Sequence, residues 1–237
     1  MISAIMPEKM LDENQRKNIG LKYRLVTFIV AIAYGGILAS LPLEVFKDRE
    51  NYLIYAANSW SILNQYWTQS PLVALSNEPI WLLINSFLAI LLPPENTLRI
   101  IIFVPAFIVA WIVLQQNPRH LVLLLLILLY PPVIKNHIIH LRQGAAIAVF
   151  LMGWVTKCKP LRWLLIGITP FIHASFFFVL GLLGLSQLAI KMRLGPDVRT
   201  LLFAASGIII SLVIGWLAAL LGARQSQQYQ FVMADVS

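Results

Sequence analysis

Long apolar runs, separated by short polar or basic connections, recur along the whole chain and constrain its fold more than any single motif. Residues 98–115 and 200–222 are almost free of charged side chains and approach the length that a helix needs to cross a hydrocarbon core of about 30 Å. Only 12% of the 237 residues are charged, which is about half of the fraction in an ordinary soluble domain. Because such a chain cannot cover its surface with polar groups in water, we expect an all-α, polytopic transmembrane helical bundle.

The apolar runs differ in length, and several of them end at proline. We expect about seven or eight membrane segments, including short or re-entrant helices, which are allowed where protein covers their backbone. A cytoplasmic tail over 1–23 precedes a transmembrane domain over 24–222, and a polar tail over 223–237 follows it. The expected apolar segments are 25–43, 79–92, 98–115, 121–134, 143–156, two halves of 161–190 around Pro170, and 200–222.

The longest polar connection, residues 44–79, is rich in Trp, Tyr, Asn, Gln and Ser. This composition is typical of the membrane–water interface, where aromatic rings anchor a protein. Tyr52, Tyr55, Asn58, Ser59 and Leu63 follow one another at roughly helical spacing. We therefore expect an external amphipathic loop that contains a helix lying in the interface.

Basic residues set the expected orientation, because cytoplasmic connections of membrane proteins are enriched in Lys and Arg. An odd number of apolar runs separates the basic N-terminal tail from the next basic cluster, so one of the short runs 79–92 and 121–134 should not cross. With that adjustment, Arg142, His173 and the loop 44–79 all lie toward the outer face. The clusters assigned to the cytoplasm are Lys9, Arg16, Lys17, Lys22 and Arg24, then Lys157, Lys159 and Arg162, then Lys191, Arg193 and Arg199.

Several functional classes are excluded by composition. The net charge of +8 does not indicate nucleic-acid binding, because the positive residues sit between apolar runs, as membrane orientation requires. Cys158 is the only cysteine, so neither an intrachain disulfide nor a cysteine metal site can form. His137 and His140 lack an identifiable third ligand, and no glycine-rich nucleotide loop occurs, so we expect no metal and no cofactor. The polar N-terminal tail makes the first apolar run an uncleaved insertion signal, which fits a multi-pass protein of a bacterial inner membrane.

The acidic residues in the long polar loop are the carboxylates best placed for chemistry. Solvation of an external loop accounts for Glu44 and Glu50. Asp48 stands beside aromatic residues suited to sugar faces, and both a solvating and a catalytic role stay open for it. Glu78 precedes a proline and an apolar run, where an acid caps free N–H groups and interacts favourably with the helix dipole. For Glu78 we therefore favour helix capping over catalysis.

Two polar residues in apolar surroundings are further candidates. An arginine that opens an apolar helix, as Arg142 does, is costly unless it is paired or functional, and its planar fork matches phosphate oxygens. The simpler interpretation is a side chain that extends to the membrane surface. The following Gly144-Ala145-Ala146 lets a backbone or a lipid approach closely. His173 is suited to accept a proton near neutral pH, or it is a core histidine satisfied by a hydrogen bond to Ser175.

Four short polar segments interrupt the apolar pattern. They are Asp48-Arg49-Glu50-Asn51-Tyr52 with Tyr55, then Glu78-Pro79 ahead of an apolar run, then Arg142-Gln143-Gly144-Ala145-Ala146, then Phe171-Ile172-His173-Ala174-Ser175. In this order they resemble the signature elements of the EpsG-like family, which is akin to the Wzy-type polymerases. The resemblance covers roughly residues 44–190, and the four elements together are more specific than any one of them.

The resemblance implies a membrane enzyme that joins undecaprenyl-pyrophosphate-linked oligosaccharide repeat units in exopolysaccharide, capsule or O-antigen synthesis, without a metal or cofactor. Arg142, helped by Gln143, would stabilise the pyrophosphate leaving group, and Asp48 or His173 would act as the base toward the attacking hydroxyl. The implied partners are the lipid-linked oligosaccharide, the bilayer and other membrane proteins of polysaccharide synthesis. The residues expected to bind substrate are Arg49, Tyr52, Tyr55, Glu78, His140, Gln143 and Ser175, with Trp60 as a further ring for stacking on sugars.

Two other functions compete with this interpretation. A flippase or transporter of lipid-linked glycans would move substrate without forming a bond, but transporters commonly show internal symmetry, and none is visible in the sequence. A non-catalytic membrane subunit would instead scaffold a synthesis complex. Members of the family are usually longer, so we expect a fragment, a truncated product or a short variant, which keeps the scaffold interpretation open.

Overall fold

The computed structural model describes the backbone of residues 13–42 and 49–220 and the side chains of residues 21–42 and 51–212. Throughout these residues the regular structure is helical, which confirms the predicted all-α class. Several helices begin with proline in their first turn, where the missing N–H has no intrahelical partner in any case. The elements are α1 Glu13–Ser40, α2 Arg49–Gln69, α3 Pro71–Ser76, α4 Pro79–Leu91, α5 Pro94–Gln116, η3 Pro118–His120, α6 Leu121–Leu128, α7 Pro131–Ile138, α8 Leu141–Val155, α9 Lys159–Ile168, η4 Thr169–Phe171, α10 Phe176–Lys191 and α11 Pro196–Leu220.

Two helical stretches are long and apolar enough to cross a membrane, Leu21–Ser40 of α1 and the whole of α5. The segments Pro118–Leu128 and Pro131–Ile138 would form a third span, although they are bent by 71° relative to each other. The described residues therefore hold two to three candidate membrane spans. The helices α4, α8 and α10 are apolar but shorter, and the 13 residues of α4 reach only about 20 Å. The larger number of membrane segments expected from the sequence stays a prediction.

The long polar connection is more ordered than a loop, because most of it forms α2 and α3. The buried side of α2 carries Tyr52, Tyr55, Ser59 and Leu63, which confirms their helical spacing. This side packs against α4. Asn58, the fifth residue of the predicted set, is exposed on another side of the helix. Most polar residues of α2 and the exposed Trp60 lie on its outward side. The polar composition of the segment therefore does not reveal that one face of the helix is buried.

Prolines divide two of the expected apolar segments. Tyr130 is extended, because the ring of Pro131 disfavours helical backbone in the residue before it, and α6 and α7 are separated there. Around Pro170 the chain forms η4, which separates α9 from α10. In contrast, α1 begins at Glu13, upstream of the first apolar run and within the segment expected to be a tail.

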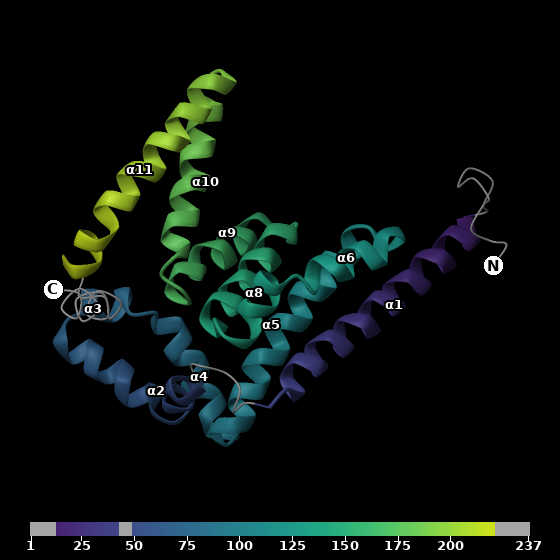
Figure 1. Ribbon diagram of the computed structural model, residues 1–237, viewed down its shortest axis with the longest axis horizontal. Helices are drawn as coiled ribbons and strands as arrows, with labels where there is room; N and C mark the ends of the chain where they lie inside the picture. Colours follow the sequence, from purple (N-terminus) through teal and green to yellow (C-terminus); the bar gives the residue numbers. More distant parts are fainter. Residues whose placement is uncertain (1–12, 43–48, 221–237) are drawn as a thin grey trace.

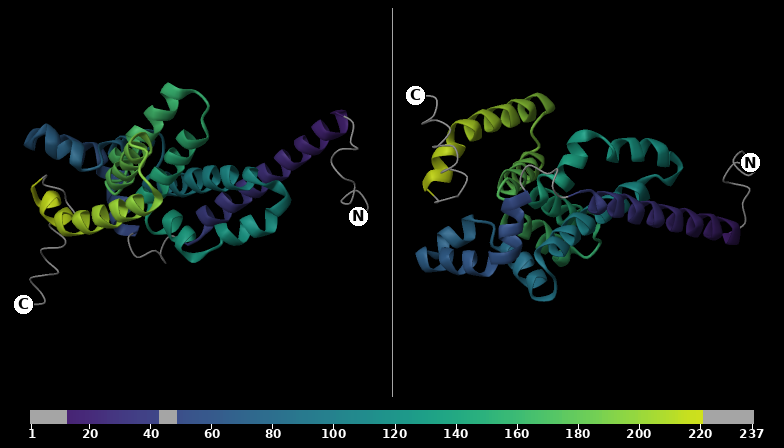
Figure 2. Two further views of the ribbon diagram at one scale, coloured as in Figure 1. Left: turned by 90° about the horizontal axis from the view of Figure 1, so that it is seen from above. Right: turned by 60° about the horizontal axis from the view of Figure 1, so that its bottom comes forward.

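The packing brings short helices together around α5. Helix α1 lies along α5, and α8 packs against another side of it (Figure 1). A Cβ at Gly35 of α1 would lie only 3.0 Å from the carbonyl oxygen of Phe103, so glycine permits the close approach of α1 to α5. Helices α10 and α11 are joined at one end and spread apart from each other (Figures 1 and 2). Helix α2 packs against α4, and the start of α8 reaches α2 through the hydrogen bond of Leu141 to Tyr52.

Candidate functional site

Glu78 lies between α3 and α4 and has an unusual backbone conformation. Its φ of 57° and ψ of 54° place it in the left-handed region, which is uncommon for a residue other than glycine. It occupies the N-cap position of α4, but its side chain makes no capping hydrogen bond. The capping role expected from the sequence is therefore wrong. The left-handed backbone turns the carboxylate away from its own helix and toward α8 and the start of α10.

The carboxylate of Glu78 joins two segments that are distant in sequence. Its Oε2 lies 2.6 Å from Nη1 of Arg142, at the start of α8. Its Oε1 lies 2.8 Å from Nδ1 of His173 and accepts the backbone N–H of Ala174 at 3.1 Å. Both oxygens are thus engaged by protein donors, and the side chain is only 7% exposed. We call Glu78, Arg142 and His173 the carboxylate cluster.

The surroundings of Glu78 keep it ionised. Burial, the largest influence, would raise the pKa of this carboxyl group, but the hydrogen bond from His173 and the charge of Arg142 hold the pKa below its usual value. An ionised carboxylate has no proton to donate, so the proton between Oε1 and Nδ1 belongs to His173. In the neutral imidazole the other nitrogen, Nε2, then carries the lone pair.

Arg142 is held on two sides. Its guanidinium carbon lies 5.7 Å above the centroid of the Tyr55 ring, within the range of a cation–π interaction. The adjacent Leu141 donates its backbone N–H to the hydroxyl of Tyr52 at 3.2 Å, which secures the first turn of α8 against α2. With 29% of its side chain exposed, Arg142 still offers donors to an outside group. The interpretation of Arg142 as a side chain that simply extends to the membrane surface does not describe these contacts.

Small residues place α8 close to α7. A Cβ at Gly144 would overlap the carbonyl oxygen of Asn136 and would also lie 3.2 Å from Nδ1 of His137. Ala145 and Ala146 are buried. The predicted close approach is confirmed at Gly144, where the neighbour is the backbone of α7.

The predicted site residues divide into those that meet and those that do not. Tyr52 and Tyr55 are buried against the protein, with the ring of Tyr52 edge-on to Trp81, so their expected stacking on sugars stays a prediction. His140 and Gln143 are half-buried beside Arg142 in sequence, and Ser175 is exposed without capping α10. The hydrogen bond expected between Ser175 and His173 is replaced by the bond to Glu78.

Two of the predicted residues cannot be placed in the cluster. Asp48 lies outside the described residues, and so does the side chain of Arg49, whose backbone begins α2. Within the described part of the chain no group of three or more His, Cys, Asp and Glu side chains is arranged to hold a metal ion. The sequence interpretation missed the N–H of Ala174 as a partner of Glu78, because a backbone donor from a distant segment has no signal in the sequence.

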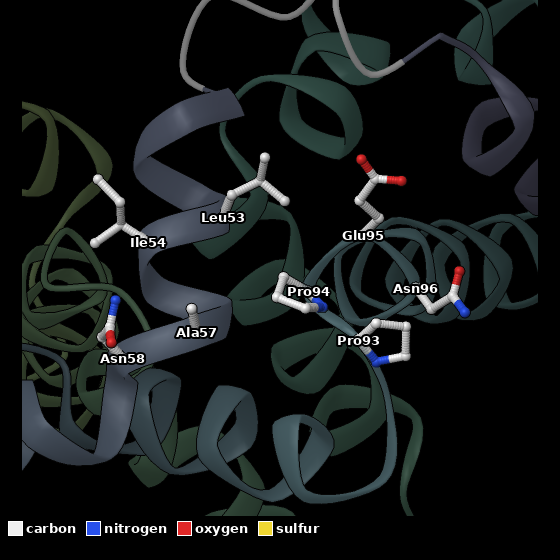
Figure 3. A pocket seen from close by; sticks show the side chains of 8 residues that line it. All are labelled: Leu53, Ile54, Ala57, Asn58, Pro93, Pro94, Glu95 and Asn96. Carbon is white, nitrogen blue, oxygen red and sulfur yellow. The ribbon is translucent and has the colours of Figure 1, made fainter.

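A separate groove of about 520 Å³ lies between α2 and the start of α5 (Figure 3). Four of its residues come from α2 and four from the turn that contains Pro93 and Pro94. None of the carboxylate cluster lines it. The groove is therefore separate from the carboxylate cluster and supports no functional assignment.

No family model, no curated protein and no solved structure matches this chain.

Proposed function

We propose that this chain is a membrane glycosyltransferase of the polymerase type, which joins oligosaccharide repeat units carried on undecaprenyl pyrophosphate. One observation carries the proposal. Polar residues from four segments that are far apart in an apolar sequence are in contact: Arg142 and His173 bind the carboxylate of Glu78, and Tyr55 lies against Arg142. Ionisable groups inside a membrane protein are costly, and a buried arrangement of acid, base and arginine is a functional site by default.

The cluster has the groups that such a transfer needs. The departing pyrophosphate develops negative charge, and Arg142 is the partly exposed cation that would bind it, with Gln143 beside it. The attacking sugar hydroxyl must lose a proton, and His173 presents a nitrogen suited to accept it. Asp48 remains the alternative base. No residue in this scheme requires a metal ion.

The membrane setting is consistent with a lipid-linked substrate. The described residues contain two to three candidate spans, and the shorter apolar helices α4 and α8 begin at the cluster. We propose a location in a bacterial inner membrane with the cluster toward the outer face. This orientation follows from the basic residues between α8 and α9 and between α10 and α11, which belong in the cytoplasm.

The test is the glycolipid profile of polymerase-deficient cells that express this chain. The wild type should produce a ladder of long glycans, and Arg142→Ala should reduce it to single lipid-linked repeat units. Arg24→Ala, at an exposed position of α1, is the matched control and should keep the ladder. His173→Ala should also lose the ladder, whereas His120→Ala, at an exposed histidine, should keep it. A ladder that persists in both cluster variants would rule out the assigned roles.

The same experiment separates the competing functions. A flippase would deliver single repeat units to the outer face without lengthening them. A scaffold subunit would restore polymer only when a separate polymerase is present. A wild-type chain that forms no polymer, alongside an established polymerase that does so in the same cells, would count against the proposal.

A further inference from the structure

The oxygens of Glu78 are already occupied by the protein. Oε2 faces Arg142, and Oε1 accepts one hydrogen bond from His173 and another from the backbone of Ala174. The residue is buried, with 6% of its surface exposed. A carboxylate in this position is poorly placed to bind a sugar hydroxyl, which was the role expected from the sequence. Its contacts point instead to an effect exerted through its neighbours.

We propose that Glu78 is a positioning residue that fixes His173 as the tautomer protonated on Nδ1, so that Nε2 takes the proton of the acceptor hydroxyl. This inference rests on the proposed function and deepens it by assigning the base and the group that orients it. Within the described residues no protein group hydrogen-bonds Nε2, and the side chain of His173 is 15% exposed. Nε2, the nitrogen that carries the lone pair, is therefore available to accept a proton from the substrate.

The geometry restrains the imidazole in two ways. His173 and Ala174 are consecutive and donate to the same oxygen, so the backbone and the ring are fixed relative to one carboxylate. Arg142 holds the other oxygen and compensates the buried charge. A second group that orients the base is the general feature of sites that activate a hydroxyl nucleophile.

The step that follows is balanced in atoms and charge. The acceptor hydroxyl oxygen attacks the anomeric carbon of the donor, and its proton passes to Nε2 of His173. The bond between the anomeric carbon and the pyrophosphate oxygen breaks, and its electron pair remains on that oxygen, near Arg142. The products are a glycosidic bond and undecaprenyl pyrophosphate, and the imidazolium of His173 then releases its proton to water.

The tautomer is measured directly by ¹⁵N NMR of histidine-labelled full-length protein in lipid nanodiscs. The chain has 4 histidines, so the His173 signals are assigned by difference from His173→Ala. At a pH above the usual titration range of histidine, wild-type His173 should carry its proton on Nδ1. In Glu78→Gln the amide donates to the ring, and the Nε2-protonated form should appear. Glu95→Gln, at an exposed acid, should leave the signals unchanged. An Nε2-protonated wild type, or no change in Glu78→Gln, would overturn the inference.

Kinetics distinguish positioning from sugar binding. With purified protein and a lipid-linked donor, Glu78→Gln should lower kcat by about 100-fold or more and leave KM nearly unchanged. Glu78→Asp keeps the charge and should retain more of the kcat. A raised KM with an unchanged kcat would support direct sugar binding instead.

The two proposals fail in different ways. If the wild type transfers no glycan but His173 shows the expected tautomer, the proposed function fails, and only the control of the His173 tautomer by Glu78 stands. If transfer occurs and Glu78→Gln keeps full kcat, the function stands and the positioning role fails. The wild-type tautomer decides the inference even if a substitution at Glu78 prevents folding.

Discussion

At the residue scale, the carboxylate cluster shows what a single sequence can indicate about a site. Arg142 and His173 were recognisable because each is a polar residue in an apolar stretch, where burial is costly unless a partner exists. The identity of the partner was not recognisable. Glu78 was expected to cap α4, since its position before Pro79 is common for caps, and the left-handed backbone that redirects its side chain is a tertiary effect.

The pairing of Glu78 with Arg142 makes a prediction about stability. Arg142→Met leaves a buried carboxylate without its cation and should destabilise the protein by about 2 kcal/mol, reduced from the fully buried case because Arg142 is partly exposed. Adding Glu78→Gln to Arg142→Met should restore part of the loss, since no charge is then buried alone. Thermal unfolding in detergent measures Arg142→Met, Glu78→Gln and the double variant. Simple addition of the two single effects would show that the residues are not energetically coupled.

At the scale of elements, proline and small residues were the most informative signals. The breaks near Pro131 and Pro170 and the close approach at Gly144 all follow from local sterics, which a sequence displays directly. Helix α2 was harder to recognise, because its exposed side is polar and its buried side contacts protein. Only the spacing of its tyrosines indicated a helix. The partner helix of each buried side could not be predicted, because contacts between distant segments have no local signature.

Two glycines give opposite predictions for the same substitution. Gly144→Ala places a methyl group on the carbonyl of Asn136, and we expect it to cost about 1–3 kcal/mol. Gly181→Ala in α10 meets nothing within 4 Å, and the higher helix propensity of alanine should leave stability equal or slightly raised. Melting temperatures of the purified variants test the contrast. Equal effects at both sites would mean that α7 and α8 are not in close contact.

At the scale of the whole molecule, the sequence predicted a membrane protein whose polar residues gather on one side of the membrane. The predicted number of membrane crossings depends on assigning the basic clusters to the cytoplasm. The single cysteine offers a direct test of orientation. Cys158 is exposed and lies among Lys157, Lys159 and Arg162, so it should be cytoplasmic. A membrane-impermeant maleimide should label it only after cells are permeabilised.

The opposite side is tested in a second variant. In a Cys158→Ser background, Ser175→Cys introduces a thiol at an exposed position two residues from His173. This thiol should react in intact cells if the cluster faces outward. Labelling of Cys158 in intact cells would reverse the proposed orientation.

At Glu78 the left-handed backbone conformation of the turn and the charge of the side chain can be considered separately. A side chain in this conformation is disfavoured by about 1–2 kcal/mol relative to the right-handed form, and glycine is the residue that avoids the penalty. A glycine at this position would therefore relax the turn while deleting the acid. Glycine would adopt the backbone conformation of the turn between α3 and α4 at a lower energetic cost than glutamate. The geometry of the turn alone therefore does not explain why glutamate is present. What glutamate adds is a negative charge that connects the start of α4, the start of α8 and the segment before α10.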